Sequence, residues 1–217
     1  MQYLSQRLAS RPSPGRGKAE RAGGSPSPQR ERIVDAAEQL IAENGVAGTS
    51  IEALVKAAGV SSITFYELFE GKEECFVAAF ERAVEEGAGE IARAAEGDPA
   101  AAGFSWSEEV ATGLRKLTGL IAARPERARL VLVEAQAGGP ELSRRFEALL
   151  DRVAAKLRQG RSLSTAPVDL PVTHEEATAG SLAWLLREKL EVGDSEGLQE
   201  LYPELIDIAL APYLGNG

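Results

Sequence analysis

Residues 58–73 carry the sequence AGVSSITFYELFEGKE, and this stretch decides the fold. It begins where an apolar helical pattern ends, at Gly59-Val60. Gly59 suits a turn position that needs a positive φ, and Val60 can fill the space between two helices. Ser61 is suited to cap a third, short helix over about 62–68. Two short helices joined by a tight, glycine-containing turn predict a helix-turn-helix.

The segments before this turn supply its partner helices. An apolar stripe with helical spacing predicts a helix over 30–44, which Asn44-Gly45 should end because glycine commonly follows a helix C-terminus. Thr49 is predicted to open the second helix, with Glu52 at the spacing of a capping box. The stripe of the first helix consists of Ile33, Ala36, Ala37, Leu40 and Ile41, and that of the second of Ile51, Leu54, Val55 and Ala58.

Every long segment after residue 73 also has a helical pattern. Pro125 and Pro140 fit the first turns of their helices, where a missing N–H costs nothing. We find no strand period and no repeat, so the sequence predicts an all-α fold. Helices are expected over about 73–96, 105–123, 125–137, 140–158, 174–191 and 195–213, with a loop over 160–172.

The residue content excludes several classes of protein. With one cysteine, Cys75, and one histidine, His174, the chain cannot form an internal disulfide, and no metal site is expected. We interpret Cys75 as a small buried hydrophobe and His174 as a surface residue at a helix start. No catalytic triad, phosphate-cradling loop or cofactor motif is present, so we expect neither an enzyme nor a cofactor. The absence of a long apolar run or a secretory pattern favours a cytoplasmic protein.

Charge is distributed unevenly along the 217 residues. The net charge is −9, yet residues 1–30 carry +5, residues 31–72 carry −4 and the remainder carries −10. Residues 1–28 are rich in Ser, Pro, Gly and Arg and show no apolar period, so we interpret them as a flexible arm. A basic arm on an acidic body suggests contact with a polyanion, although an inert tail is equally compatible with this composition.

The segment 30–80 resembles the DNA-binding domain of the tetracycline-repressor (TetR) family of bacterial transcriptional regulators. Its run Ala-Gly-Val-Ser-x-x-Thr-Phe-Tyr-x-x-Phe-x-x-Lys-Glu is highly specific for that family, whereas the C-terminal part matches only in style. The resemblance implies a homodimer that binds double-stranded DNA at an inverted-repeat operator. It also implies a repressor that releases this operator on binding a small, largely apolar molecule. The implied parts are the arm (1–28), a three-helix helix-turn-helix domain (29–72) and a helical-bundle domain for ligand binding and dimerisation (73–217).

The resemblance also implies which residues meet DNA. Phe65 and Phe69 are four residues apart and should face the core, whereas Tyr66 is offset from them. Ser62 and Glu67 stand where the family usually has basic residues and His or Tyr, so the recognition helix has no positive charge of its own. The arm is then a source of the missing counterion release. The expected DNA-contacting residues are Thr49, Ser61, Ser62, Ile63, Thr64, Tyr66, Glu67 and Lys72, with Thr49 and Lys72 on phosphates.

A ligand pocket is expected between the helices that follow residue 73. Its lining should be apolar, and the acidic body favours a neutral or cationic ligand. Glu134, inside an apolar run, either pairs with Arg144 or Arg145 or offers the ligand a polar contact, and Thr118 or Trp106 also suit that role. The expected pocket residues, each of which would otherwise be ordinary core, are Phe76, Phe80, Trp106, Leu117, Leu130, Val133, Glu134 and Trp184.

The last two helices carry more apolar surface than one face needs. One stripe can cover the core of the protomer, and a second can meet a two-fold mate, which is how the family dimerises. The expected interface residues are Gly180, Ser181, Ala183, Tyr202, Ile206, Ala209 and Tyr213. A helical interaction module that does not bind DNA is the alternative, because the recognition helix is acidic.

Overall fold

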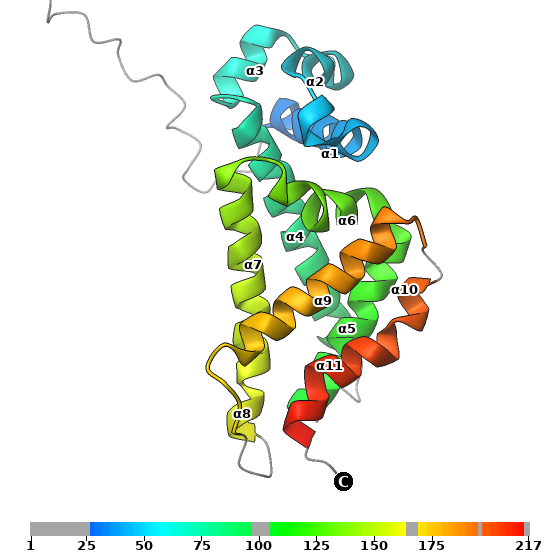
Figure 1. Ribbon diagram of the computed structural model, residues 1–217. Helices are drawn as coiled ribbons and strands as arrows, with labels where there is room; N and C mark the ends of the chain where they lie inside the picture. Colours follow the sequence, from blue (N-terminus) through cyan, green and yellow to red (C-terminus); the bar gives the residue numbers. More distant parts are fainter. Residues whose placement is uncertain (1–26, 97–104, 164–168, 195–196, 215–217) are drawn as a thin grey trace, which may run out of the picture.

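The structure is a computed structural model, and it describes residues 27–96, 105–163, 169–194 and 197–214. Helices and their connections account for all of these residues, and no strand occurs among them. Figure 1 shows a group of three helices at one end of the molecule and a bundle of longer helices beneath it. The predicted arm, residues 1–28, lies outside the described residues except for its last two.

The small N-terminal domain follows the predicted pattern. Ser27 caps its first helix by accepting a hydrogen bond from the Arg30 N–H, and Pro28 occupies the first turn. The helix is interrupted at Gly45, whose φ of 69° confirms the predicted stop. The three helices are α1 (Pro28–Gly48), α2 (Ile51–Ala58) and α3 (Ser62–Leu68).

The cap of α2 differs from the prediction. Ser50, not Thr49, caps the helix and accepts a hydrogen bond from the Ala53 N–H. Thr49 is buried, and its hydroxyl donates to the Gly45 carbonyl at 2.8 Å. The Thr49 N–H bonds to the Val46 carbonyl where α1 ends, so the Gly45 carbonyl accepts from the Thr49 hydroxyl instead. The next turn is as predicted, with Gly59 in the left-handed region at φ 62°.

The body is a bundle in which α9 packs on α6 and α7, and α11 packs on α5 and α9. A capping box formed by Ser105 and Glu108 begins α5. The predicted helix over 125–137 ends at Leu132 and continues as a 3₁₀ turn, and the last helix is divided at Leu201. The body elements are α4 (Lys72–Glu96), α5 (Trp106–Ala123), α6 (Pro125–Leu132), η2 (Glu134–Gln136), α7 (Pro140–Arg158), α8 (Gly160–Leu163), α9 (His174–Glu191), α10 (Gly197–Glu200) and α11 (Tyr202–Leu214). No described helix is long and apolar enough to cross a membrane.

Two hydrophobic cores hold these elements together. The first runs from the small domain into α4, α6 and the start of α7, and it includes Phe65, Phe76 and Leu130. The second joins α5, α6 and the end of α7 to α9, α10 and α11. Because the small domain shares the first core with the body, it packs directly on α4 and α6 and is not an independent unit.

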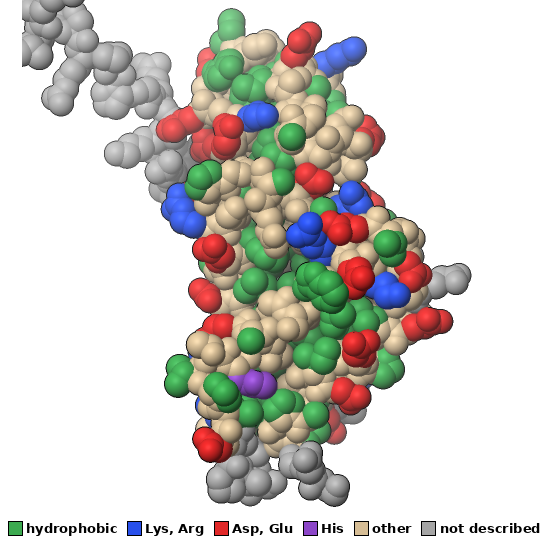
Figure 2. Space-filling view, viewed as in Figure 1, with side chains coloured by type: hydrophobic (Ala, Val, Ile, Leu, Met, Phe, Trp, Pro, Cys, Tyr) green, Lys and Arg blue, Asp and Glu red, His purple; other side chains and the backbone are tan. Residues whose placement is uncertain are grey.

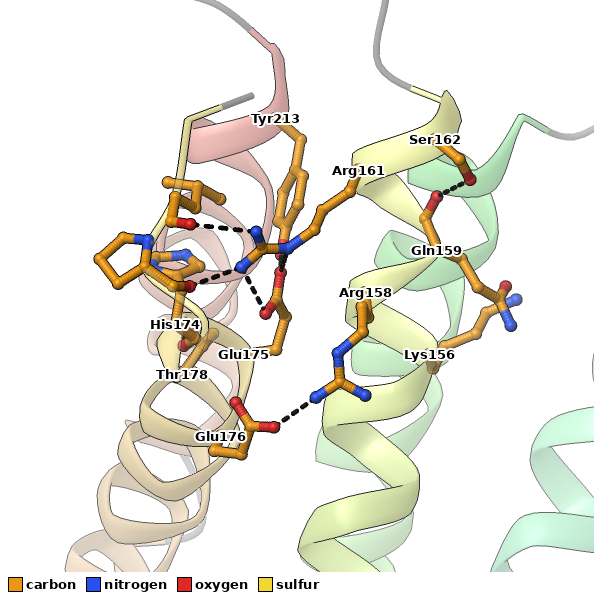
Figure 3. Close-up of polar contacts among 12 residues, drawn as sticks. Lys156, Arg158, Gln159, Arg161, Ser162, His174, Glu175, Glu176, Thr178 and Tyr213 are labelled. Atoms are coloured by element: carbon orange, nitrogen blue, oxygen red, sulfur yellow. Dashed lines mark hydrogen bonds and ion pairs between the residues drawn. The ribbon is translucent and has the colours of Figure 1, made fainter. Parts of the chain in front are cut away.

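A buried polar cluster ties the distal end of the bundle together (Figure 3). Glu175, at the start of α9, is fully buried. Its carboxylate accepts hydrogen bonds from Arg161 of α8 at 2.6 and 2.8 Å and from the Tyr213 hydroxyl of α11 at 2.8 Å. These partners lower the pKa of Glu175 to about 2, with the Arg161 hydrogen bond as the largest cause. Part of the predicted 160–172 loop is therefore helix α8, fixed by an ion pair.

Candidate nucleic-acid interface and ligand pocket

The recognition helix α3 presents one face to the core and one to solvent. Ser61 caps it by accepting from the Thr64 N–H at 3.0 Å, and the two hydroxyls lie 2.9 Å apart. Phe65 and Phe69 are buried, with ring centroids 5.5 Å apart, and they anchor the helix. Tyr66 is 59% exposed. The predicted division between core and outward residues on this helix is confirmed.

The outward face of α3 has little positive charge of its own. Ile63 is 74% exposed and, with Tyr66, gives the helix an apolar and aromatic surface beside Ser62 and Glu67. The basic side chain that contacts the end of this helix is Arg30 of α1, whose guanidinium carbon lies 5.0 Å from the centroid of the Phe69 ring. Exposed basic residues also occur on the flanking helices, Arg32 on α1 and Lys56 at the end of α2.

Lys72 and Thr49 form a joint between the small domain and the body. The Lys72 ammonium lies 3.4 Å from the Thr49 carbonyl and 5.9 Å from the centroid of the Phe76 ring. The expected phosphate contact from the Thr49 hydroxyl is wrong, since that group is buried and already donates to Gly45. Lys72 is only half-buried and keeps N–H groups for a further acceptor.

An apolar pocket of about 280 Å³ lies within the bundle between α4, α5, α6, α7 and α9. Of the eight predicted pocket residues, Leu117 alone is among the described residues that line it. Aliphatic side chains make up most of the wall, including Val84, Leu117, Ile121, Val131, Leu149 and Leu182.

The other predicted pocket residues lie elsewhere for separate reasons. Phe76, Phe80 and Leu130 fill the core beneath the small domain. Trp106 is in the second core, where its indole N–H donates to the Lys156 carbonyl at 2.9 Å. Trp184 is 60% exposed on α9. Val133 only borders the second core.

Glu134 has a partner that neither predicted alternative named. Its carboxylate accepts from the Val46 N–H at 2.9 Å, across the junction with the small domain. Arg144 and Arg145 pair with Glu141 instead, and Arg145 also with Glu81. The interruption of α1 at Gly45 leaves the buried Val46 N–H without a helical acceptor, and Glu134 supplies one.

The charges around the pocket differ from those of the whole body. Its described lining contains three arginines, Arg124, Arg127 and Arg152, and no carboxylate. The expectation of a neutral or cationic ligand came from the net charge of the body, and the lining does not support a cation. Two of these arginines are already ion-paired on their other side, Arg124 with Glu90 and Arg127 with Glu38 and Glu86.

The expected dimer residues divide into inward and outward groups. Ala209 and Tyr213 are buried within the protomer, so their assignment to the interface is wrong. The Tyr202 hydroxyl donates to the Ala111 carbonyl of α5, and its ring packs inside the protomer. Ser181 and Trp184 of α9 face outward. Figure 2 shows hydrophobic side chains gathered over α9 and α11 between acidic groups.

The two candidate reactive residues have ordinary environments. Cys75 is buried, and burial raises the pKa of its thiol to about 12, which leaves it an unreactive core residue. His174 is half-buried at the start of α9, more enclosed than predicted, with its ring 6.2 Å from that of Tyr213. Among the described residues no cluster of His, Cys, Asp or Glu is arranged to hold a metal ion.

Comparison with known proteins agrees with this geometry. Residues 33–79 match the family model for bacterial regulatory proteins of the tetR family. Among curated proteins no sequence relative was found. The fold is similar to that of the fatty acid degradation regulator FadR of Bacillus halodurans (TM-score 0.72, 19% identity, covering 86% of this chain and 97% of that one).

Two further solved structures are similar. FadR of Bacillus subtilis, solved in complex with stearoyl-CoA, has a TM-score of 0.68 and 19% identity, covering 83% of this chain and 97% of that one. SmeT, the repressor of a multidrug efflux pump of Stenotrophomonas maltophilia, has a TM-score of 0.65 and 21% identity, covering 87% and 91%. The segment 33–79 is therefore similar to the N-terminal domain of tetR-family regulatory proteins, and the chain shares the overall fold of the regulators named above.

Proposed function

We propose that the protein is a homodimeric repressor that binds an inverted-repeat operator and releases it when a small, largely apolar molecule enters the pocket. The observation that carries this proposal is the apolar pocket of about 280 Å³ that α4 and α6 line from the body side. Both helices also pack against α1 of the small domain. A ligand that favours one position of these helices would therefore change the position of the recognition helix.

In this proposal residues 29–72 bind DNA, and residues 73–217 bind the ligand and the partner protomer. Tyr66 and Ile63 are the groups best placed for base edges or a thymine methyl group, because they are the most exposed large side chains of α3. Glu67 can accept from a cytosine amino group. The other proposed contacts are Ser61, Ser62 and Thr64 at the N-terminal end of the same helix and Lys72 at the start of α4.

Two of the similar structures support a ligand-responsive repressor with this fold. The Bacillus subtilis FadR structure contains stearoyl-CoA, a molecule with a long apolar chain, and SmeT is a repressor. The shared fold makes a pocket between the body helices a reasonable receptor here. The size of the effect on DNA cannot exceed the difference between the ligand affinities of the two states.

The test is DNA selection with the purified protein, followed by a screen of apolar compounds for release of the selected DNA. Leu117→Trp should fill the pocket and abolish release while DNA affinity stays within about twofold, since Leu117 is remote from α3. Leu163→Trp is the matched control, because Leu163 is exposed on α8 and does not line the pocket. If Leu117→Trp still responds like the control, the ligand binds elsewhere.

A further inference from the structure

Two arginines lie between the apolar pocket and a second cavity next to the small domain, and they line both. Arg124 and Arg127 line the apolar pocket, and they also line an acidic cavity of about 710 Å³ whose other residues come from α1, α4 and α6. In the acidic cavity both are paired: Arg124 with Glu90 at 2.6 Å, and Arg127 with Glu38 at 2.9 Å and with Glu86. Each guanidinium therefore lies among carboxylates on the acidic side, while the same arginine side chain also borders the apolar space.

The partner of Arg127 is a residue of the DNA-binding domain. Glu38 lies on α1, is 7% exposed, and accepts from Arg127 of α6 and from Arg82 of α4, each at 2.9 Å. Arg82 has a second partner on α1, Asp35 at 2.7 Å. Loss of Arg127 alone would thus remove the ion pair between α1 and α6 but keep those between α1 and α4. A nearly buried carboxylate that loses one of two cationic partners is strongly disfavoured, so the tie has a large effect on where α1 sits.

We propose that the ligand is an amphiphile with an apolar chain and an anionic end, and that this end binds Arg127, with Arg124 beside it, in competition with Glu38. This inference rests on the proposed ligand function of the pocket and names the chemistry of its ligand. The chain fills the aliphatic space, and the anion takes guanidinium N–H groups that otherwise hold α1. The DNA-binding domain then loses its ion pair to α6 and can shift on the shared core, which lowers its affinity for the operator. The described lining of the apolar pocket contains no carboxylate, so the carboxylates with which the anion competes are those already paired with the two arginines, Glu38, Glu86 and Glu90.

Decanoate and decanol serve as matched probes, since they share a chain and differ in charge. Binding to the full-length protein is measured by calorimetry, and release of selected operator DNA by fluorescence anisotropy. We expect decanoate to bind the wild type at least about tenfold more tightly than decanol, a ratio that corresponds to about 1.4 kcal/mol. We also expect decanoate to release DNA at a lower occupancy of the protein than decanol does.

Two substitutions distinguish an Arg127 that binds the anionic ligand from an Arg127 that only forms a structural ion pair between α1 and α6. Arg127→Gln should bring decanoate affinity down to that of decanol, and Glu38→Gln should raise decanoate affinity because the competitor is gone. Both should weaken DNA binding in the absence of ligand, since both break the tie between α1 and α6. A brace without a ligand role would weaken DNA binding in the same way but would leave the ratio of decanoate to decanol unchanged.

Arg145→Gln is the control, because Arg145 pairs with Glu81 and Glu141 within the body and touches neither α1 nor the pocket. Retained decanol binding shows that each variant is folded with an intact pocket. Equal affinities of the wild type for decanoate and decanol, or a ratio that persists in Arg127→Gln, would overturn the inference. If both probes then still release DNA, the proposed function stands without it. If neither probe binds or releases DNA, the proposed function fails together with the inference.

Discussion

Phe65 and Tyr66 are neighbours on the recognition helix but lie in opposite environments, one in the core and one in solvent. Phe65 is fully buried against Phe69, whereas the ring of Tyr66, 5.5 Å away, is mostly in solvent. We expect Tyr66→Ala to weaken specific DNA binding by about 1–3 kcal/mol, the range of a good groove contact, and to leave the unfolding free energy nearly unchanged. Phe65→Ala is the contrasting variant and should cost about 3–5 kcal/mol of stability. Unchanged operator affinity in Tyr66→Ala, measured by titration, would remove Tyr66 from the interface.

Glu175 makes the stability of the protein depend on acid. Its pKa of about 2 lies below the usual value of 4.5, so its contribution is present above pH 4.5 and is lost as the pH falls toward 2. We expect the wild type to exceed Glu175→Gln in unfolding free energy by about 3 kcal/mol at neutral pH, and this difference to shrink between about pH 4.5 and 2. Urea unfolding of both proteins across that range measures it. A difference independent of pH would show that the ionised carboxylate is not what Arg161 and Tyr213 stabilise.

The number of residues that separate two contacting residues in the sequence decides whether their contact could be predicted. The faces of α3 follow from a spacing of three and four residues, and Phe65, Phe69 and Tyr66 were placed correctly. The partner of Glu134 lies 88 residues away and that of Arg127 lies 89 residues away, so no local pattern contains them. Apolar residues at helical spacing do not reveal whether they face a filled core or a pocket. For that reason Phe76, Phe80 and Leu130, which fill the core, were assigned to the pocket.

Helix boundaries were also predicted well where they depend on local sequence and poorly where they depend on packing. Prolines, glycines and the Ser61 cap act within one turn, and they predicted most of the described helices closely. Thr49 and Ser50 both have hydroxyls suitable for a cap, and the spacing from Thr49 to Glu52 favoured the wrong one. Which hydroxyl turns inward depends on the free carbonyl at Gly45, a consequence of how α1 ends on the body. Packing of α1 against η2 is therefore part of what defines the end of this helix.

The junction between α1 and η2 can be tested through Glu134. Glu134→Ala leaves the buried Val46 N–H without its acceptor, so we expect a loss of about 1–3 kcal/mol in unfolding free energy. Glu141→Ala is a fitting control, because that residue makes only surface ion pairs within α7 and should cost less than about 0.5 kcal/mol. Chemical denaturation compares the two. Equal small losses would mean that water replaces Glu134 at the junction.

The uneven charge of the whole molecule gives a prediction for DNA affinity. Residues 1–26 hold Arg7, Arg11, Arg16, Lys18 and Arg21 against Glu20, whereas α3 has no basic residue. Removing residues 1–26 keeps Ser27 as the cap of α1. We expect this deletion to weaken binding to all DNA sequences alike and to flatten the plot of log affinity against log salt by about 0.9 per lost phosphate contact. An unchanged slope would show that the arm takes no part in binding.

In the proposed function a dimer places two recognition helices on one operator, and we expect α9 to form its interface. Trp184 is 60% exposed on this helix, and Leu214 at the end of α11 is 62% exposed, so the outward face of the last helices remains apolar after the protomer core is complete. At Gly180 an added Cβ would meet nothing within 4 Å, which leaves room for the close approach of a second helix. A two-fold pair formed here would bury the same face of both protomers and fix the spacing of the two half-sites.

We therefore expect the wild type to sediment as a dimer at micromolar concentration and Trp184→Glu to sediment as a monomer, because two buried carboxylates would face each other across the two-fold axis. The monomer should lose affinity for a full inverted repeat but bind a single half-site as the wild type does. Leu163→Glu, which changes an equally exposed residue of α8, should remain dimeric. If the wild type is itself a monomer under these conditions, the face of α9 and α11 has another partner and the expectation of an inverted repeat loses its basis.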